Sequence, residues 1–222
     1  MKELLLKYKH GWILVYFLMY FPWFAFLEKT VTVDSRFHVV HMAIDDYIPF
    51  IEFFIIPYLL WFAYVAAAII FFFLTNVSDY YKLCCFLFIG MTVFLLVSTI
   101  FPNGHYLRPS VFPRDNICTA LVQWLYATDT STNLFPSIHV FNSLGVHIAV
   151  MHSEKLREYR WVRICSWLLM TSIVLSTMFL KQHSVFDVLT GFLMAAVLYT
   201  FVYGREWQQN RRKVYQGQLQ KI

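Results

Sequence analysis

The chain has 222 residues, of which 59% are hydrophobic and only 14% are charged. Soluble domains are nearer about 45–50% apolar and about 25% charged. The composition therefore excludes an ordinary soluble domain and predicts an integral membrane protein. A chain of this length suits one compact domain over residues 1–222 and leaves little room for a second.

An apolar, aromatic-rich run at Gly11–Leu27 follows a lysine-containing N-terminus. This arrangement resembles a signal peptide. However, Phe26, Leu27 and Glu28 stand where a cleavage site would have small residues. We therefore expect a retained first membrane span.

The segment Glu28–Pro49 is polar and mixed. Phe37, Val40, Ile44 and Tyr47 recur in it at helical spacing, which predicts a short helix lying on the membrane surface. Its histidines and aspartates would also suit a metal site, but a surface that faces lipid headgroups is the stronger prediction.

Five further apolar runs complete a predicted all-α bundle of six transmembrane helices. They cover Ile51–Leu74, Leu83–Phe101, Pro136–His152, Trp161–Leu180 and Ser184–Gly204. Between them we expect a short loop at Thr75–Tyr81 and a long loop at Pro102–Phe135. The tail 205–222 is polar and basic, and we expect it to meet anionic headgroups and not nucleic acid.

The distribution of positive charge predicts the orientation of this bundle. With both termini cytoplasmic, thirteen of the 18 lysine and arginine residues fall in inner segments and five in outer ones. Positive charge favours the cytoplasmic side of a membrane. The loop 102–135, the start of the fourth span and the turn 180–184 then share the non-cytoplasmic face, most simply that of the cell membrane.

The four cysteines show no spacing typical of a disulfide framework or a zinc site. The chain also lacks the HExxH motif and a glycine-rich nucleotide loop. We therefore predict neither a metal nor a cofactor.

His183 and Asp187 are four positions apart where the last two apolar runs meet. If Asp187 lies in the first turn of a helix, the two side chains share one face. A carboxylate that accepts the proton of one ring nitrogen leaves the other nitrogen basic and fixed in direction. On these two residues alone, a structural His–Asp contact is equally consistent.

Two other segments belong to the same predicted face. Pro136 and Ser137 suit the start of a helix, where free N–H groups favour an anion, and His139 lies in the same first turn. Arg108 in the long loop adds a planar cation whose donors match phosphate oxygens. Two histidines, one carboxylate, one arginine and a helix start are together the components of phosphoryl transfer through a histidine nucleophile.

These residues resemble the signatures of the type 2 phosphatidic acid phosphatase superfamily, the lipid phosphate phosphatase fold. That family carries K-x6-RP, PSGH and SR-x5-H-x3-D. The chain shows Arg108-Pro109, then Pro136-Ser137-Ile138-His139, then Ser176-Thr177 followed by His183 and Asp187, all within 101–187. The resemblance covers roughly residues 100–200 and implies one six-helix phosphatase-like domain.

The chain departs from the family pattern at three positions. Phe101 replaces the lysine of the first signature, Ile138 the glycine of the second and Thr177 the arginine of the third. Two family cations are therefore absent, and Lys181 and His105 are the candidates to replace them. The altered second signature resembles the inositol phosphorylceramide synthase branch, which transfers a phospho-headgroup to an alcohol.

The resemblance implies a metal-independent phosphatase acting on a lipid phosphate or phospholipid through a phosphohistidine. His183 would be the nucleophile, Asp187 would hold its ring, and His139 would be the acid and base. Arg108, Ser137 and Ser176 would bind phosphate oxygens.

Two alternatives remain. One is a phospho-headgroup transferase of the inositol phosphorylceramide synthase type, because the sequence does not choose between water and an alcohol as acceptor. The other is a non-catalytic lipid-binding or transport protein on the same fold.

Overall fold

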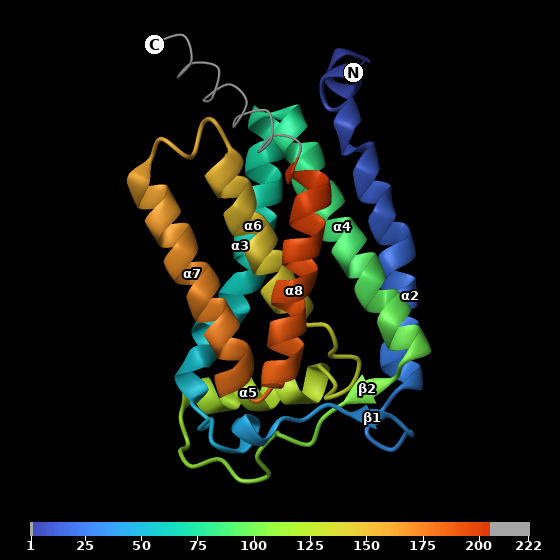
Figure 1. Ribbon diagram of the computed structural model, residues 1–222, viewed down its shortest axis with the longest axis vertical. Helices are drawn as coiled ribbons and strands as arrows, with labels where there is room; N and C mark the ends of the chain where they lie inside the picture. Colours follow the sequence, from blue (N-terminus) through green and yellow to red (C-terminus); the bar gives the residue numbers. More distant parts are fainter. Residues whose placement is uncertain (1, 205–222) are drawn as a thin grey trace, which may run out of the picture.

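The computed structural model describes residues 2–204, so the predicted basic tail 205–222 lies outside the described residues. Long helices run side by side, and short elements cover one end of the bundle (Figure 1). The elements are α1 Lys2–Lys7, the 3-10 helix η1 Lys9–Tyr16, α2 Phe17–Thr30, β1 His38–Val39, the 3-10 helices η2 Ala43–Asp46 and η3 Glu52–Phe54, α3 Ile55–Thr75, α4 Val77–Ile100, β2 Asn103–Gly104, α5 Ile117–Thr128, α6 Ile138–His152, α7 Arg160–Phe179 and α8 Val185–Val202.

Five helical segments in the described part of the chain are long and apolar enough to cross a membrane. They are Lys9–Thr30, Glu52–Thr75, Val77–Ile100, Arg160–Phe179 and Val185–Val202. The structure thus confirms the prediction of a mostly helical membrane protein with several spans. The helix α6 has only 15 residues, which gives about 22 Å at 1.5 Å per residue, against about 30 Å for a bilayer core.

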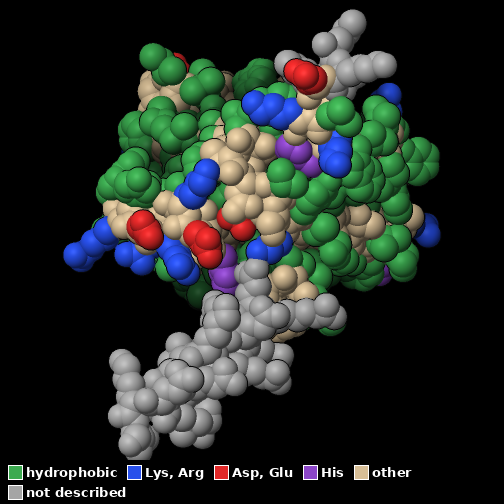
Figure 2. All heavy atoms as spheres, turned by 90° about the horizontal axis from the view of Figure 1, so that it is seen from above, with side chains coloured by type: hydrophobic (Ala, Val, Ile, Leu, Met, Phe, Trp, Pro, Cys, Tyr) green, Lys and Arg blue, Asp and Glu red, His purple; other side chains and the backbone are tan. Residues whose placement is uncertain are grey.

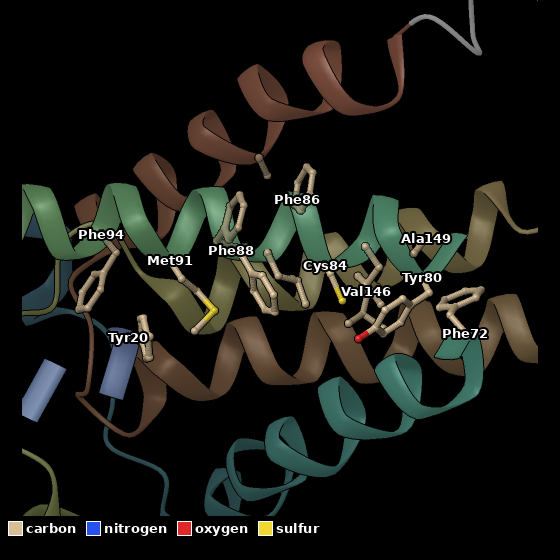
Figure 3. Packing of buried hydrophobic residues seen from close by; sticks show 14 of the residues in the cluster. Tyr20, Phe72, Tyr80, Cys84, Phe86, Phe88, Met91, Phe94, Val146 and Ala149 are labelled. Atoms are coloured by element: carbon tan, nitrogen blue, oxygen red, sulfur yellow. The ribbon is translucent and has the colours of Figure 1, made fainter. Parts of the chain in front are cut away.

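The short helix α6 lies in the middle of the bundle, where it packs against α3, α4, α7 and α8. A Cβ atom on Gly90 of α4 would lie 2.0 Å from a ring carbon of Phe141 in α6, so only glycine permits this approach. Next to it, the rings of Phe86 and Phe141 stack with centroids 4.7 Å apart. Figure 3 shows Phe86, together with other side chains of α4, within this buried cluster. This packing fixes α6, whose first turn carries His139.

The predicted surface helix in Glu28–Pro49 is limited to the four-residue 3-10 helix η2. Instead His38 and Val39 pair in parallel with Asn103 and Gly104, as strands β1 and β2. The stripe that suggested a helix is not buried as a unit, since Tyr47 is 85% exposed. Tertiary hydrogen bonds to the long loop satisfy the backbone here, and they override the helical spacing of the apolar residues.

Two predicted loops also differ from the structure. The loop expected at Thr75–Tyr81 is only Asn76, whose side chain accepts from the N–H groups of Ser78 and Asp79 and so begins α4. The long loop contains the helix α5, which begins after a similar cap at Asn116. An asparagine N-cap begins each helix, and at Asn76 it starts α4 before the apolar run that was expected from Leu83.

One end of the bundle carries the loops and α5, and the opposite end carries the turn between α6 and α7 (Figure 1). That opposite end is the face seen in Figure 2, and lysine and arginine side chains lie on it. Lys155, Arg157 and Arg160 in the α6–α7 turn are exposed there. The chain therefore separates a basic end from the end that holds the predicted site.

Candidate active site

The turn between α7 and α8 carries His183 in a fixed backbone conformation. The N–H groups of Gln182 and His183 both donate to the carbonyl oxygen of Thr177, at 2.9 and 3.0 Å. Lys181 takes the left-handed conformation, with φ 52°, that allows this tight reversal. The turn thereby points the His183 ring into the protein, where only 4% of the residue is exposed.

Asp187 lies in the first turn of α8 and faces His183, as its spacing predicted. Its Oδ2 is 3.4 Å from Nδ1 of His183 and accepts a hydrogen bond of 3.0 Å from the N–H of Ser184. Ser184 is the N-cap of the helix, and its own hydroxyl accepts from Phe186. A capping box therefore holds the carboxylate in position against the imidazole.

His139 lies in the first turn of α6. Ser137 is the N-cap, and its Oγ accepts from the N–H of Val140 at 3.4 Å. The prediction that Pro136 occupies the first helical turn is wrong, because Pro136 precedes the N-cap and the helix begins at Ile138. Gly191 of α8 allows α6 and α8 to approach each other closely at this point. A Cβ atom on it would lie 3.1 Å from the Ser137 carbonyl oxygen.

The two histidines are brought together from segments 44 residues apart. Nε2 of His183 lies 3.4 Å from Nδ1 of His139, and the ring centroids are 5.6 Å apart. Tyr58 and Trp61 of α3 pack on the His139 ring at 4.7 and 4.4 Å. Because Nδ1 of His183 faces Asp187, its other nitrogen is the one that faces His139.

The His183 ring is neutral near pH 7. Burial lowers the pKa of His183 to about 3, and the nearby Arg108 charge acts in the same direction. A neutral imidazole keeps a lone pair on one nitrogen, so Nε2 can attack an electrophile.

Arg108 is held by backbone oxygens. It donates to the carbonyl oxygens of Tyr126, Asp129 and Thr130 and, at 2.6 Å, to Oε1 of Gln182. Its guanidinium also stacks on the Tyr126 ring at 4.4 Å. Burial lowers the pKa of Arg108, although carboxylates nearby oppose this. Arg108 therefore joins the long loop to the turn that carries His183.

Three other predicted phosphate ligands make hydrogen bonds within the protein. Ser176 donates to the Ile173 carbonyl oxygen within its own helix, and the Ser137 hydroxyl caps α6. Nζ of Lys181 donates to the Asp45 carbonyl oxygen at 2.6 Å. These side chains do not line the pocket described below.

His105, the other candidate to replace a family cation, has contacts at both ring nitrogens. Its Nε2 is 2.9 Å from the Gln182 carbonyl oxygen, and its Nδ1 accepts from the N–H of Leu107. Burial lowers the pKa of His105 to about 4. Both nitrogens are used and the ring is neutral near pH 7, so it supplies neither a free donor nor a charge.

Asp45 is a residue that sequence reasoning missed. It is 1% exposed, and its carboxylate accepts from the Ser184 hydroxyl at 2.5 Å and from the Val185 N–H at 2.8 Å. It thus fixes the start of α8 from a segment about 140 residues earlier. No local motif marks this role, because Asp45 lies in the segment that was predicted to face headgroups.

A pocket opens beside the two histidines. It is lined by Phe24, Glu28, Tyr58, Phe94, Asp129, Thr132, Asn133, Leu134, Ile138, His139, Gln182 and His183. Glu28 accepts from Thr130 and Asn133, which places it beside the long loop. Burial raises the pKa of Asp129 to about 6, with Arg108 opposing. The pocket lining thus includes two histidines, and it includes the carboxylates of Glu28 and Asp129, which we call the oxygen-rich wall.

Residues 107–211 match the family model described as the PAP2 superfamily. The searches of curated proteins and of solved structures gave no significant match. The matched region includes His139 and His183, which line the pocket, and Asp187, which contacts His183.

Proposed function

Because the chain belongs to the PAP2 superfamily through residues 107–211, we propose that it is a membrane phosphatase acting on a lipid phosphate or related phosphoester. One observation carries this proposal: Nε2 of His183 faces His139 across 3.4 Å while Nδ1 faces Asp187. A buried nucleophile and a second histidine then border one pocket, and the orienting carboxylate contacts the nucleophile's other ring nitrogen.

In the first step, the lone pair on Nε2 of His183 forms a bond to phosphorus, and the bond from phosphorus to the ester oxygen breaks. That oxygen keeps the electron pair, takes a proton from the protonated ring of His139, which becomes neutral, and leaves as the alcohol. Asp187 stabilises the positive charge that the His183 ring gains. Its 3.4 Å contact is long for a hydrogen bond and is expected to shorten as this charge develops.

In the second step, His139 takes a proton from water as the water oxygen bonds to phosphorus. The phosphorus–nitrogen bond breaks, its electron pair returns to Nε2 of His183, and phosphate leaves. The two nitrogens are in direct contact without substrate, so a phosphoryl group must enter from the pocket and move the rings apart. The N-terminus of α6 offers N–H groups and a favourable dipole to its oxygens.

The same proposal includes six spans, with α6 as the embedded fourth, and cytoplasmic termini in the cell membrane. The exposed basic residues of the α6–α7 turn support this orientation, since positive charge favours the cytoplasmic side. The α7–α8 turn, which carries His183, lies at the opposite end (Figure 1), and the histidines would face the non-cytoplasmic side. A lipid phosphate could then reach the pocket from the outer leaflet.

A second candidate function is transfer of the phospho-headgroup to an alcohol. The oxygen-rich wall favours it, because the carboxylates of Glu28 and Asp129 can accept hydrogen bonds from the hydroxyls of an acceptor. The reaction differs only in the second step, where the alcohol oxygen replaces the water oxygen.

Incubating the detergent-solubilised protein with a lipid phosphate, and separately with a phospholipid and a polyol, separates these functions. Hydrolysis predicts free phosphate that does not depend on the polyol. Transfer predicts a new phosphodiester that appears only with the polyol. A protein that yields neither product from a panel of phospholipids would contradict both and favour a non-catalytic lipid-binding role.

A further inference from the structure

The side chain of Gln182, which directly precedes the proposed nucleophile, has a fixed orientation. Only 1% of Gln182 is exposed, and one end of its amide lies 2.6 Å from Nη2 of Arg108. A guanidinium can only donate hydrogen bonds, so the amide oxygen must face it. The amide nitrogen, Nε2, therefore points away from Arg108.

This amide nitrogen is a buried donor without a partner. Nε2 of Gln182 makes no hydrogen bond within residues 2–204, although Gln182 lines the pocket beside both histidines. Buried donors are nearly always paired because losing water without a replacement bond is unfavourable. An acceptor brought by a ligand would satisfy it.

The backbone around Gln182 is equally constrained. Its N–H donates to Thr177, and its carbonyl oxygen lies 2.9 Å from Nε2 of His105. Arg108 itself is anchored on the Asp129 and Thr130 carbonyl oxygens. The amide is therefore positioned before any ligand arrives, which is what stabilisation of a developing charge requires.

We propose that Nε2 of Gln182 donates a hydrogen bond to a phosphoryl oxygen during transfer, with Arg108 orienting and polarising the amide from behind. This inference rests on the proposed function and adds a substrate-binding residue to it. It also explains how the site works with threonine at 177, where the family carries a cation. The Thr177 hydroxyl is turned to the Val174 carbonyl oxygen and does not fill that role.

The substitution Gln182→Glu separates this role from a purely structural one. Glutamate has the same shape and keeps an oxygen facing Arg108, so the bridge to the long loop survives. Its second oxygen replaces the donor with an acceptor that repels a phosphoryl group. The matched control is Gln123→Glu, which makes the same chemical change on an exposed position of α5.

Two measurements are made on each purified protein: kcat/KM for a lipid phosphate, and the rise in Tm caused by orthovanadate. We expect Gln182→Glu to lower kcat/KM by about 10²–10³-fold, the range for loss of one such donor. It should also lose the vanadate effect while its Tm without ligand stays at the value of the control. The uncharged variant Gln182→Met should lose activity as well, which excludes simple charge repulsion as the cause.

Wild-type activity and vanadate stabilisation in Gln182→Glu would overturn the donor role and leave the proposed function standing. A loss of activity matched by a lowered Tm in Gln182→Glu, with normal vanadate stabilisation, would assign Gln182 a structural role and also overturn it. A wild-type protein that neither turns over substrate nor responds to vanadate would overturn the proposed function together with this inference.

Discussion

Replacing His183 with alanine is expected to lower the turnover of a lipid phosphate by about 10⁴–10⁶-fold, the scale for loss of a nucleophile. The ring supplies the only nitrogen in the described site that is both neutral and fixed by a carboxylate on its far side. Turnover is measured as product release from detergent-solubilised protein, and folding as Tm.

The histidine at 147 provides a matched control for this experiment. It lies further along α6, where its Nδ1 is 2.9 Å from the Ser166 hydroxyl. His147→Ala also removes a partly buried histidine from the bundle, but it should leave kcat unchanged. If His183→Ala kept most of the activity in a folded protein, the nucleophile would have to be another group.

His139→Gln is expected to show a loss that depends on the leaving group. Glutamine keeps the size and polarity of the side chain but transfers no proton. With a lipid phosphate, whose alcohol leaves poorly, kcat should fall by about 10²–10⁴-fold. With p-nitrophenyl phosphate, whose leaving group needs no proton, the first turnover should remain fast and only the second step should slow.

Rapid-mixing measurements of p-nitrophenol release test this prediction. A burst of one equivalent followed by slow release would fit a general acid that later becomes the base. Equal slowing of the first turnover for both substrates would mean that His139 does not protonate the leaving group. The Tyr58 and Trp61 rings that enclose His139 are unchanged in this variant, so the shape of the pocket is retained.

The local features of the site were predictable from the sequence. The spacing of His183 and Asp187 places them on one face once a helix begins at Ser184, and serine three residues before aspartate is a capping signal. The Ser137 cap likewise places His139 in a first turn. These predictions concern residues within one helical turn, where the geometry of the helix decides the outcome.

The partners of the charged side chains were not predictable in the same way. Arg108, Lys181 and His105 all bind backbone carbonyl oxygens. Every residue has such an oxygen, so only the fold decides which one lies within reach. Residue type alone therefore does not distinguish a phosphate ligand from a loop anchor. Asp45 and Glu28 join the site through contacts across about 100 residues or more, which no local pattern encodes.

The segment 28–49 shows the limit of periodicity. Its apolar spacing suggested a helix, but Asp45 is buried against the start of α8 and the strand β1 pairs with β2. The pairing of β1 uses the backbone in a way that a helix there would prevent, while Asp45 lies in the short 3-10 helix η2. The missed structure is also what holds the turn at His183 in place.

Trapping the covalent intermediate tests the central claim most directly. His139→Gln protein is mixed with radiolabelled p-nitrophenyl phosphate, quenched in alkali, and digested for mass spectrometry. The mechanism predicts one phosphoryl group per chain on His183, stable in alkali and lost in acid as expected for a phosphorus–nitrogen bond. It also predicts that the double variant His139→Gln/His183→Ala takes up no label. Label on any other residue, or turnover without label, would contradict a phosphohistidine at His183.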